Sequence, residues 1–290
     1  MIYASAPGKV NLFFEVGAAR EDGYHSVLSL YQSLAIRQTV GVEPADNWQV
    51  ETTGNLPQQQ LDLVPANEAN LVVIAAKALA EYVDIASPQP MRFETHKEVP
   101  VAAGLAGGSA DAAAALVALN EAWCLGLSAE QLSEVGAKVG SDVPFALLGG
   151  TAIGVDTGIE LTSLPPLPKR QVVLVVSPFG LSTGSVFQKF DELFPEGDLH
   201  QTKTELAEAV ASGTLRFGRN SLMPAALAMR PELADLVDQL QLPVMLSGSG
   251  PTLALITESA AEAESWAEKV ETAGQFAIKT TTDSRGAALD

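Results

Sequence analysis

Alternating apolar and polar positions recur along the first half of the chain and predict short β-strands. One longer stretch, from about Glu68 to Tyr82, has a strongly helical pattern. The predicted strands lie at Tyr3–Ala6, Asn11–Val16, Ile36–Val42, Gln49–Thr53 and Met91–Glu94. This mixture of strands and helix predicts an α+β domain.

A glycine- and alanine-rich loop at 100–110 leads into a region of predicted helices. Residues 111–120 are mostly alanine and leucine, which favour helix. Ser128 and Gln131 form a capping-box pattern that opens the next helix. Pro144 then suits the first turn of a further short helix.

Prolines cluster at 164–168 and predict a connector between two domains, which we place at 1–163 and 169–290. The hydrophobic rhythm restarts after the connector. The second domain then reads as a strand at 171–177, helices near 204–211, 222–229 and 231–240, strands at 244–246 and 253–256, a helix at 259–272 and a strand at 276–281. The order β-α-β-β-α-β is that of a ferredoxin-like fold.

Charge and composition narrow the function. The 290 residues are 47% hydrophobic and carry a formal net charge of −18, so nucleic acid and anionic membranes are not expected as partners. The same negative charge requires any phosphate site to be built locally, from backbone N–H groups, a few lysines and a divalent cation. There is one cysteine and no run of about 20 apolar residues, and we expect a cytoplasmic protein.

The loop at 100–110 is the clearest candidate for a phosphate site. Its small residues let the backbone bend tightly, and the following helix directs its N-terminal N–H groups toward an anion. Ser109 offers a hydroxyl to a phosphate oxygen or to Mg²⁺, and Asp111 is either a helix cap or a metal-shell residue. Neither a Walker A nor a Rossmann pattern is present. A plain hinge between a strand and a packed helix is the alternative. The loop residues are Pro100, Val101, Ala102, Ala103, Gly104, Leu105, Ala106, Gly107, Gly108, Ser109 and Ala110.

The loop and the residue after it, Asp111, resemble the second motif of the GHMP kinases, the family of galactokinase, homoserine kinase and mevalonate kinase. The segment 6–12 resembles the first motif, and the segment 246–252 resembles the third. The segments 20–25 and 140–145 are most similar to family members whose acceptor is a cytidine diphosphate-linked polyol. Three motifs in the same order make the resemblance specific.

This resemblance implies a two-domain GHMP kinase fold, with an N-terminal domain like domain 2 of ribosomal protein S5 and the active site in the cleft between the domains. It also implies ATP, with Mg²⁺, as the donor that phosphorylates the 2-hydroxyl of the polyol, in the non-mevalonate isoprenoid pathway. Alanine replaces glycine of the wider pattern at Ala102, Ala103 and Ala106. Any of these positions that needs a positive φ is strained by the side chain.

Phosphoryl transfer to an alcohol needs help with the hydroxyl proton and neutralisation of charge on the transferred group. The resemblance assigns the catalytic base to Asp142, and its alternative role is the N-cap of the short helix that follows. Lys9 lies between two predicted strands, where its ammonium can orient the acceptor hydroxyl and favour the ionised form of Asp142. An exposed strand lysine is the alternative for Lys9.

The substrate candidates are Asn11, Tyr24, His25 and Phe187, which the resemblance places beside the acceptor. Tyr24 and Phe187 offer rings on which cytosine can stack, and His25 offers hydrogen bonds to the base. Without the resemblance, the Tyr-His pair is ordinary surface.

Asn70 and Lys97 are candidates for the adenine side of the ATP site, and surface positions are the alternative for both. The turn at 247–252 is either a simple hairpin or a second wall of the cleft.

Two rival functions follow from these residues. One is another GHMP kinase with a smaller acceptor, such as homoserine or mevalonate, which becomes favoured if Tyr24, His25 and Phe187 point away from the acceptor pocket. The other is a non-catalytic nucleotide-binding protein, which we expect to lack Lys9 or Asp142. We expect a monomer or a homodimer.

Overall fold

Two long antiparallel strands, β1 (Ile2–Ala19) and β2 (His25–Pro44), organise the fold. The structure is a computed structural model and describes all residues from 1 to 290. The prediction of separate strands at 3–6 and 11–16, and of a strand only at 36–42 of β2, was wrong. Both strands are buried on both faces along most of their length, so the alternation that marks a half-buried strand is missing there.

The first sheet has seven strands in the order β11-β1-β2-β4-β3, with β5 pairing β2 and β6 pairing β5. The second half of β2 pairs with β4, and its first half pairs with β5. Strands β5 and β6 were not predicted. The remaining strands are β3 (Gln49–Gly54), β4 (Met91–Lys97), β5 (Thr151–Val155), β6 (Glu160–Leu164) and β11 (Ala288–Leu289).

Five helices accompany this sheet, and the alanine-rich α3 is the central one. Its alanines are small enough for close packing against both the sheet and α2, and the first core forms around them. The segment 58–60 forms most of the short helix α1. The helices are α1 (Gln58–Leu61), α2 (Leu71–Tyr82), α3 (Gly107–Ala122), α4 (Ala129–Val139) and α5 (Val143–Leu148). The capping box of Ser128 and Gln131 is confirmed at the start of α4.

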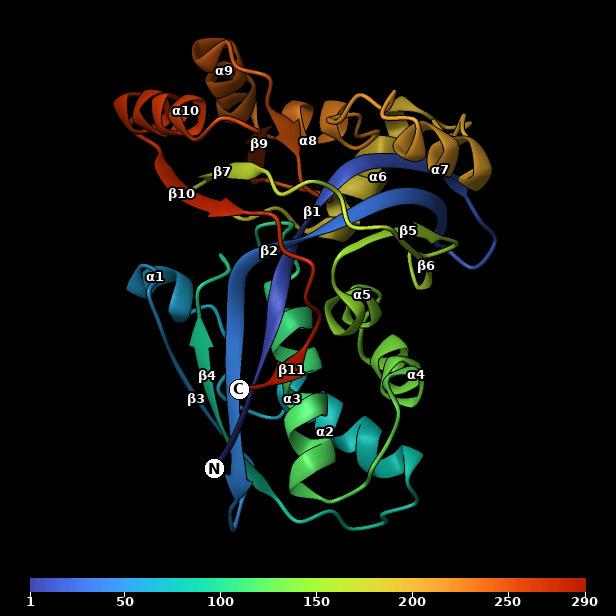
Figure 1. The fold of residues 1–290 in the computed structure, drawn as a ribbon, viewed down its shortest axis with the longest axis vertical. Coiled ribbons are helices and arrows are strands. Elements are labelled where there is room, and N and C mark those ends of the chain that lie inside the picture. The colour runs from blue at the N-terminus through green and yellow to red at the C-terminus, as the bar shows by residue number, and fades with distance from the viewer.

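The second sheet lies at the other end of the molecule and is entirely antiparallel, in the order β10-β7-β9-β8. The predicted β-α-β-β-α-β order is confirmed, but helix α6 was not predicted. Its strands are β7 (Gln171–Val176), β8 (Met245–Leu246), β9 (Leu253–Thr257) and β10 (Phe276–Thr281). Its helices are α6 (Thr183–Leu193), α7 (Lys203–Ala211), α8 (Met223–Met229), α9 (Pro231–Leu240) and α10 (Ala260–Thr272). Figure 1 shows these elements grouped above the helices of the first sheet.

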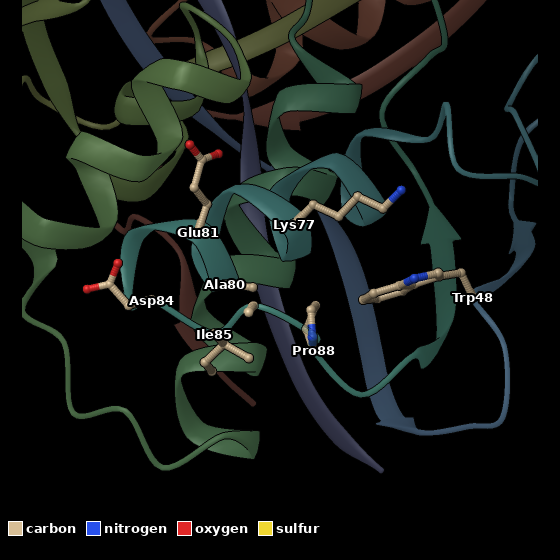
Figure 2. A pocket seen from close by; sticks show the side chains of 8 residues that line it. Trp48, Lys77, Ala80, Glu81, Asp84, Ile85 and Pro88 are labelled. Carbon is tan, nitrogen blue, oxygen red and sulfur yellow. The ribbon is translucent and has the colours of Figure 1, made fainter.

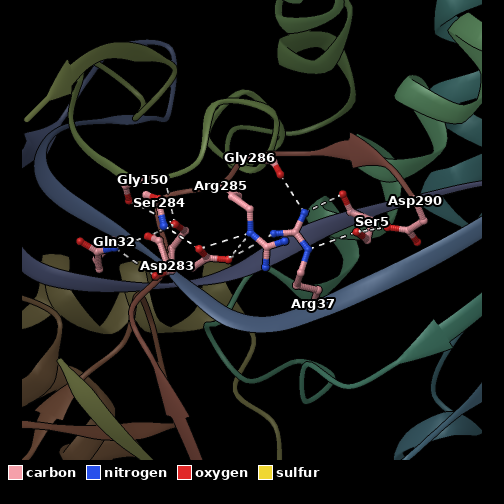
Figure 3. Close-up of polar contacts among 10 residues, drawn as sticks. Ser5, Gln32, Arg37, Gly150, Asp283, Ser284, Arg285, Gly286 and Asp290 are labelled. Atoms are coloured by element: carbon pink, nitrogen blue, oxygen red, sulfur yellow. Dashed lines mark hydrogen bonds and ion pairs between the residues drawn. The ribbon is translucent and has the colours of Figure 1, made fainter. Parts of the chain in front are cut away.

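The C-terminal tail returns to the first sheet after β10. Strand β11 pairs with β1, and the Arg37 side chain donates to the carbonyls of Ser5 (2.9 Å) and Gly286 (2.7 Å). Figure 3 shows Arg37 between these groups and Asp283. The division at 163 and 169 stays a prediction, and β11 crosses back over it. No helix has the combination of length and apolarity needed to span a bilayer.

Candidate active site

A cleft of about 400 Å³ opens where the two halves of the molecule meet. Its walls come from β1, the loop before α3, the first turn of α3, the residues before α5, the start of α6 and the turn between β8 and β9. Segments far apart in the sequence therefore contribute to one site. The lining residues from the sequence predictions are Lys9, Asn11, Ala102, Ala103, Gly104, Ala106, Gly107, Gly108, Ser109, Asp142 and Phe187.

The N-terminus of α3 faces this cleft. The helix begins at Gly107 and not at the predicted 111, so Gly107, Gly108 and Ser109 form its first turn. Their backbone N–H groups donate to no carbonyl of the chain. Free amides at the positive end of the helix dipole make an anion site without any lysine. This arrangement meets the requirement that the protein's negative charge imposes.

Two loop alanines adopt the left-handed conformation. Ala102 has φ 51° and Ala106 has φ 58°, a geometry that costs an L-residue roughly 1–2 kcal/mol. Gly104 also has a positive φ, 76°, but it cannot be replaced by alanine, because an added Cβ would lie 2.1 Å from the carbonyl oxygen of Ser247. The loop therefore needs glycine at Gly104 and carries strain at the two alanines.

The loop at 100–110 is tied to its neighbours by hydrogen bonds. The backbone N–H of Lys9 donates to the carbonyl of Leu105 (3.1 Å), and the Ser247 hydroxyl donates to the carbonyl of Gly104 (2.9 Å). The Asn220 side chain in turn donates to the carbonyls of Leu246 (2.9 Å) and Gly248 (2.8 Å). The turn at 247–252 is thus a β-hairpin turn, as predicted, and it also lines the cleft.

Lys9 and Asp142 meet inside the cleft. Lys9 Nζ lies 3.8 Å from Asp142 Oδ2 and donates to Asn11 Oδ1 at 2.8 Å. Asn11 donates onward to the Ser29 hydroxyl at 2.7 Å. The register of β1 against β2 shifts on both sides of Lys9 and Asn11, and such bulges re-aim side chains. Lys9 is only 4% exposed, so the surface alternative for it is wrong.

Lys9 is almost completely buried in the wall of the cleft. Burial lowers the pKa of the Lys9 ammonium, and the Asp142 carboxylate opposes that shift. The ammonium lies 5.6 Å from the ring centroid of Tyr31, which itself stacks on Phe145. Burial, and secondly the charge of Asp142, raises the pKa of the Tyr31 hydroxyl, which therefore stays neutral at physiological pH.

Asp142 occupies the N-cap position of α5, but its side chain makes no capping hydrogen bond. The carboxylate is 27% exposed on the cleft side and has the Lys9 ammonium as its charged neighbour. Asp142 therefore occupies the predicted N-cap position, but its side chain does not accept a hydrogen bond from the helix. A carboxylate that is free of the helix end remains available to a ligand.

The predicted base-binding residues are divided between the cleft and its surroundings. Phe187, on α6, lines the cleft, and the His25 ring packs on it with centroids 4.9 Å apart. His25 Nε2 lies 2.7 Å from Asp191 Oδ1, which fixes the imidazole orientation. Tyr24 is 64% exposed and is not among the lining residues.

Two further predicted residues lie outside the cleft. Asn70 caps α2 by accepting from the Val72 N–H (3.1 Å) and donates to the Pro65 carbonyl (2.7 Å). Lys97 forms a fully buried ion pair with Asp111, whose predicted role as a helix cap is wrong because Ala106 holds that position. Burial raises the pKa of the Asp111 carboxyl, and Lys97 opposes that shift. Of the loop residues, Pro100, Val101, Leu105 and Ala110 do not line the cleft.

Several lining residues were not singled out from the sequence. Tyr31 faces Lys9, and the Thr183 and Ser249 hydroxyls form a hydrogen bond of 3.0 Å in the cleft wall. Ser182, directly before Thr183, is the N-cap of α6, and it is the local sequence signal for this unpredicted helix. Tyr31 lies in the doubly buried part of β2, where the sequence pattern carried no strand signal.

A second hollow of about 540 Å³ lies elsewhere, between Trp48, helix α2 and the loop after it (Figure 2). It is open to solvent and contains none of the predicted site residues. Of the large hollows, only the cleft contains the first turn of α3 and the Lys9–Asp142 pair.

Comparison with known proteins is consistent with this geometry. Residues 70–150 match the family described as GHMP kinases N terminal domain, and residues 199–275 match GHMP kinases C terminal. A 4-diphosphocytidyl-2-C-methyl-D-erythritol kinase of Nocardioides sp. is 40% identical over 279 residues, which cover 93% of each chain. The chain belongs to the GHMP kinase family.

Solved structures of GHMP kinases share the fold. A crystal structure of 4-(cytidine 5'-diphospho)-2C-methyl-D-erythritol kinase superposes with a TM-score of 0.74 at 29% identity, covering 97% of this chain and 99% of that chain. Homoserine kinase from Cytophaga hutchinsonii has a TM-score of 0.66 at 15% identity, covering 100% and 97%. The second likeness concerns the fold alone. The α+β fold expected from the sequence is confirmed.

Proposed function

We propose that this GHMP kinase transfers the γ-phosphoryl group of ATP to the 2-hydroxyl of 4-diphosphocytidyl-2-C-methyl-D-erythritol, in the non-mevalonate route to isoprenoid precursors. The observation that carries the proposal is the Lys9–Asp142 pair, which lies in the same cleft as the free amides of α3. The similar kinases that bear this substrate in their names support the choice of acceptor over homoserine or mevalonate.

The donor side of the site is the first turn of α3. The amides of Gly107, Gly108 and Ser109 bind the ATP phosphates, since they point into the cleft region with no other acceptor. No group of three or more carboxylate, His or Cys side chains is placed to cage a metal ion. Mg²⁺ needs no such cage, because it binds through one or two protein oxygens and the substrate phosphates.

The Ser109 hydroxyl fits that ion. It lines the cleft from the first turn of α3, where its oxygen can reach a bound ligand. When bound there with ATP, Mg²⁺ supplies neutralisation of charge on the β- and γ-phosphates. The chain's own contribution is to hold the nucleotide through Ser109 and the α3 amides.

The acceptor side of the site is the Lys9–Asp142 pair. An Asp142 carboxylate oxygen takes the proton of the acceptor hydroxyl. The hydroxyl oxygen of the acceptor then bonds to the γ-phosphorus, while the bond between the γ-phosphorus and the bridging oxygen of ADP breaks. The products are ADP and the phosphate monoester. The Lys9 ammonium stabilises negative charge that develops on the transferred group. Asn11 orients Lys9 and contacts the polyol.

Base recognition rests on the rings beside the cleft. Phe187 stacks against cytosine, with His25 locked behind it by Asp191 and by ring packing. The exposed ring of Tyr24, next to His25, provides a second stacking surface for the base. We also propose that the protein works in the cytoplasm as a monomer or homodimer, and that residues 1–163 and 169–290 form its two domains.

The position of the new phosphate tests the proposal. Product made from ATP, Mg²⁺ and the acceptor is analysed by phosphorus and carbon NMR. We expect a phosphate monoester on the 2-carbon and an intact diphosphate. A phosphate on another hydroxyl, or hydrolysis of the diphosphate, would contradict the proposed reaction.

A further inference from the structure

A buried glutamine holds both ends of the phosphate loop. Gln38 lies on β2, opposite Ala6 of β1, and its side chain is completely buried. Its Oε1 accepts from the backbone N–H of Glu98 (2.8 Å) and of Val99 (3.2 Å), directly before the loop. Its Nε2 donates to the carbonyl of Gly107 (3.3 Å), where the irregular part of the loop passes into α3.

We propose that Gln38 is a positioning residue for nucleotide binding, which acts by fixing the shape of the phosphate loop and touches no substrate itself. The inference rests on the proposed function only in taking this loop as the ATP site. None of the three GHMP motifs includes Gln38.

The chemistry of the bridge requires a carboxamide. The loop presents two donors at its start and one acceptor at its end, and the glutamine side chain is an acceptor at one atom and a donor at the other. An ionised carboxylate accepts from Glu98 and Val99 but has no proton for Gly107. An apolar side chain leaves the Glu98 and Val99 N–H groups unpaired and removes one donor from the Gly107 carbonyl, which keeps its helical partner in the first turn of α3. Unpaired buried backbone groups cost about 1–3 kcal/mol each.

The glycine at 107 leaves room for this contact. A Cβ on Gly107 would lie 3.3 Å from Gln38 Nε2 and 3.2 Å from the Val99 carbonyl oxygen. Both neighbours belong to the same bridge. The absence of a side chain at Gly107 therefore lets the end of the loop approach its start.

Closure of the loop matters because residues 102 and 106 are strained within it. Two alanines with positive φ relax toward ordinary backbone conformations unless the ends of the loop are held. Relaxation would turn the amides of Gly107 and Gly108 away from one common direction. The Gln38 bridge thus pre-organises the anion site, so that ATP binding does not have to order the loop.

A second buried glutamine on the same strand provides a matched control. Gln32 is 2% exposed, and its amide donates to the Asp283 carbonyl (2.8 Å) and accepts from the Thr151 hydroxyl (2.7 Å). These partners belong to the tail and to β5, away from the loop. Loss of either glutamine removes buried hydrogen bonds, but only Gln38 bonds to the nucleotide site.

The experiment compares binding in Q38M, Q38E and Q32M. Dissociation constants for MgATP and for the cytidylated acceptor are measured by titration calorimetry, and Tm by calorimetric melting. We expect Q38M to weaken MgATP about tenfold or more and to change acceptor binding less than twofold, as one lost buried bond is worth about a factor of ten. Q38E keeps the two acceptor contacts but places a buried negative charge beside the phosphate site, so it should weaken MgATP at least as much as Q38M. Q32M should lower Tm and leave MgATP binding within twofold.

The outcomes are separable. Unchanged MgATP binding in Q38M, or equal loss of MgATP binding in Q38M and Q32M, would overturn the positioning role. If Q38M does not fold, Q38E decides, and wild-type MgATP affinity in Q38E would overturn the need for the Gly107 contact. If wild type fails to bind the cytidylated acceptor, the proposed acceptor fails, while the MgATP comparison still tests Gln38.

Discussion

Lys9 Nζ lies 3.8 Å from Asp142 Oδ2, and the two residues reach this position from different layers of the molecule, strand β1 and the start of helix α5. The separation is longer than a direct hydrogen bond. It leaves space for an acceptor hydroxyl to contact both groups. The first prediction follows from this geometry.

Replacement of Asp142 by asparagine should reduce kcat by about 10²–10⁴-fold, the usual contribution of a positioned base. The fold should remain, because the Asp142 side chain makes no capping hydrogen bond that the substitution would remove. Single-turnover kinetics measure the chemical step, and Tm measures the fold. The exposed Asp84→Asn is the control and should behave as wild type. A D142N rate within tenfold of wild type would exclude Asp142 as the base.

The pH dependence should report the buried ammonium of Lys9. Burial lowers its pKa below the ordinary value of 10.5, so between these two pKa values the unfolded chain binds more protons than the fold. The free energy of unfolding of the wild type, compared with that of K9M, should therefore be lowest below the pKa of Lys9 in the folded protein. It should rise as the pH increases from that pKa to 10.5. Denaturant unfolding of both proteins between neutral pH and the ordinary lysine pKa measures this. Parallel profiles would show that Lys9 titrates normally.

The same shift has a consequence for activity. kcat should fall once the pH exceeds the lowered pKa of Lys9, because the neutral amine no longer stabilises charge on the transferred group. The alkaline limb of the kcat profile should thus lie below the pH of ordinary lysine titration. A flat profile up to that pH would contradict the role of the ammonium.

Phe187 should control acceptor affinity and not ATP affinity. A stacked base is worth about 1–3 kcal/mol, so F187L should raise KM for the cytidylated acceptor about 5- to 150-fold. KM for ATP should change less than twofold, since the α3 amides lie on the donor side. F194L is the matched control, because Phe194 stacks on Phe190 outside the cleft. An equal rise in both KM values for F187L would count against base stacking.

The C-terminal tail should be sensitive at Gly286. A Cβ there would lie 2.0 Å from the Leu147 carbonyl oxygen, at the end of the helix that begins after Asp142. G286A should lower the free energy of unfolding by about 1–3 kcal/mol or more, measured by denaturant titration. G184A, where an added Cβ meets nothing within 4 Å, should not destabilise the protein. Wild-type stability of G286A would mean that the tail adapts freely.

Local signals in the sequence predicted much of this structure. The capping box at Ser128, the strands from β7 to β10 and the short helix after Asp142 each depend on nearby residues, and each was found. The three motifs and the segment 140–145 brought Lys9, the loop at 100–110 and Asp142 together because their resemblance carries information about distant contacts. Their individual roles stay predictions until the variants are measured.

The strands and contacts that the sequence did not predict depend on packing between distant segments. The first half of β2 is buried on both faces because neighbouring layers cover it. Buried polar side chains such as Ser29, Gln32 and Ser33 interrupt its apolar residues, so no alternation marks the strand. Lys97 finds its partner Asp111 only through the packing of β4 on α3. The return of β11 to β1 joins the two ends of the chain, and no local pattern encodes that pairing.

The most direct test of the account is ADP release by the purified protein with ATP, Mg²⁺ and one acceptor at a time. The acceptors are 4-diphosphocytidyl-2-C-methyl-D-erythritol, the same polyol as its 4-phosphate without cytidine, homoserine and mevalonate. We expect kcat/KM to be highest for the cytidylated acceptor by at least about 10²-fold, because the others lack the base that Phe187 stacks on. Turnover only with homoserine or mevalonate would contradict the proposed substrate.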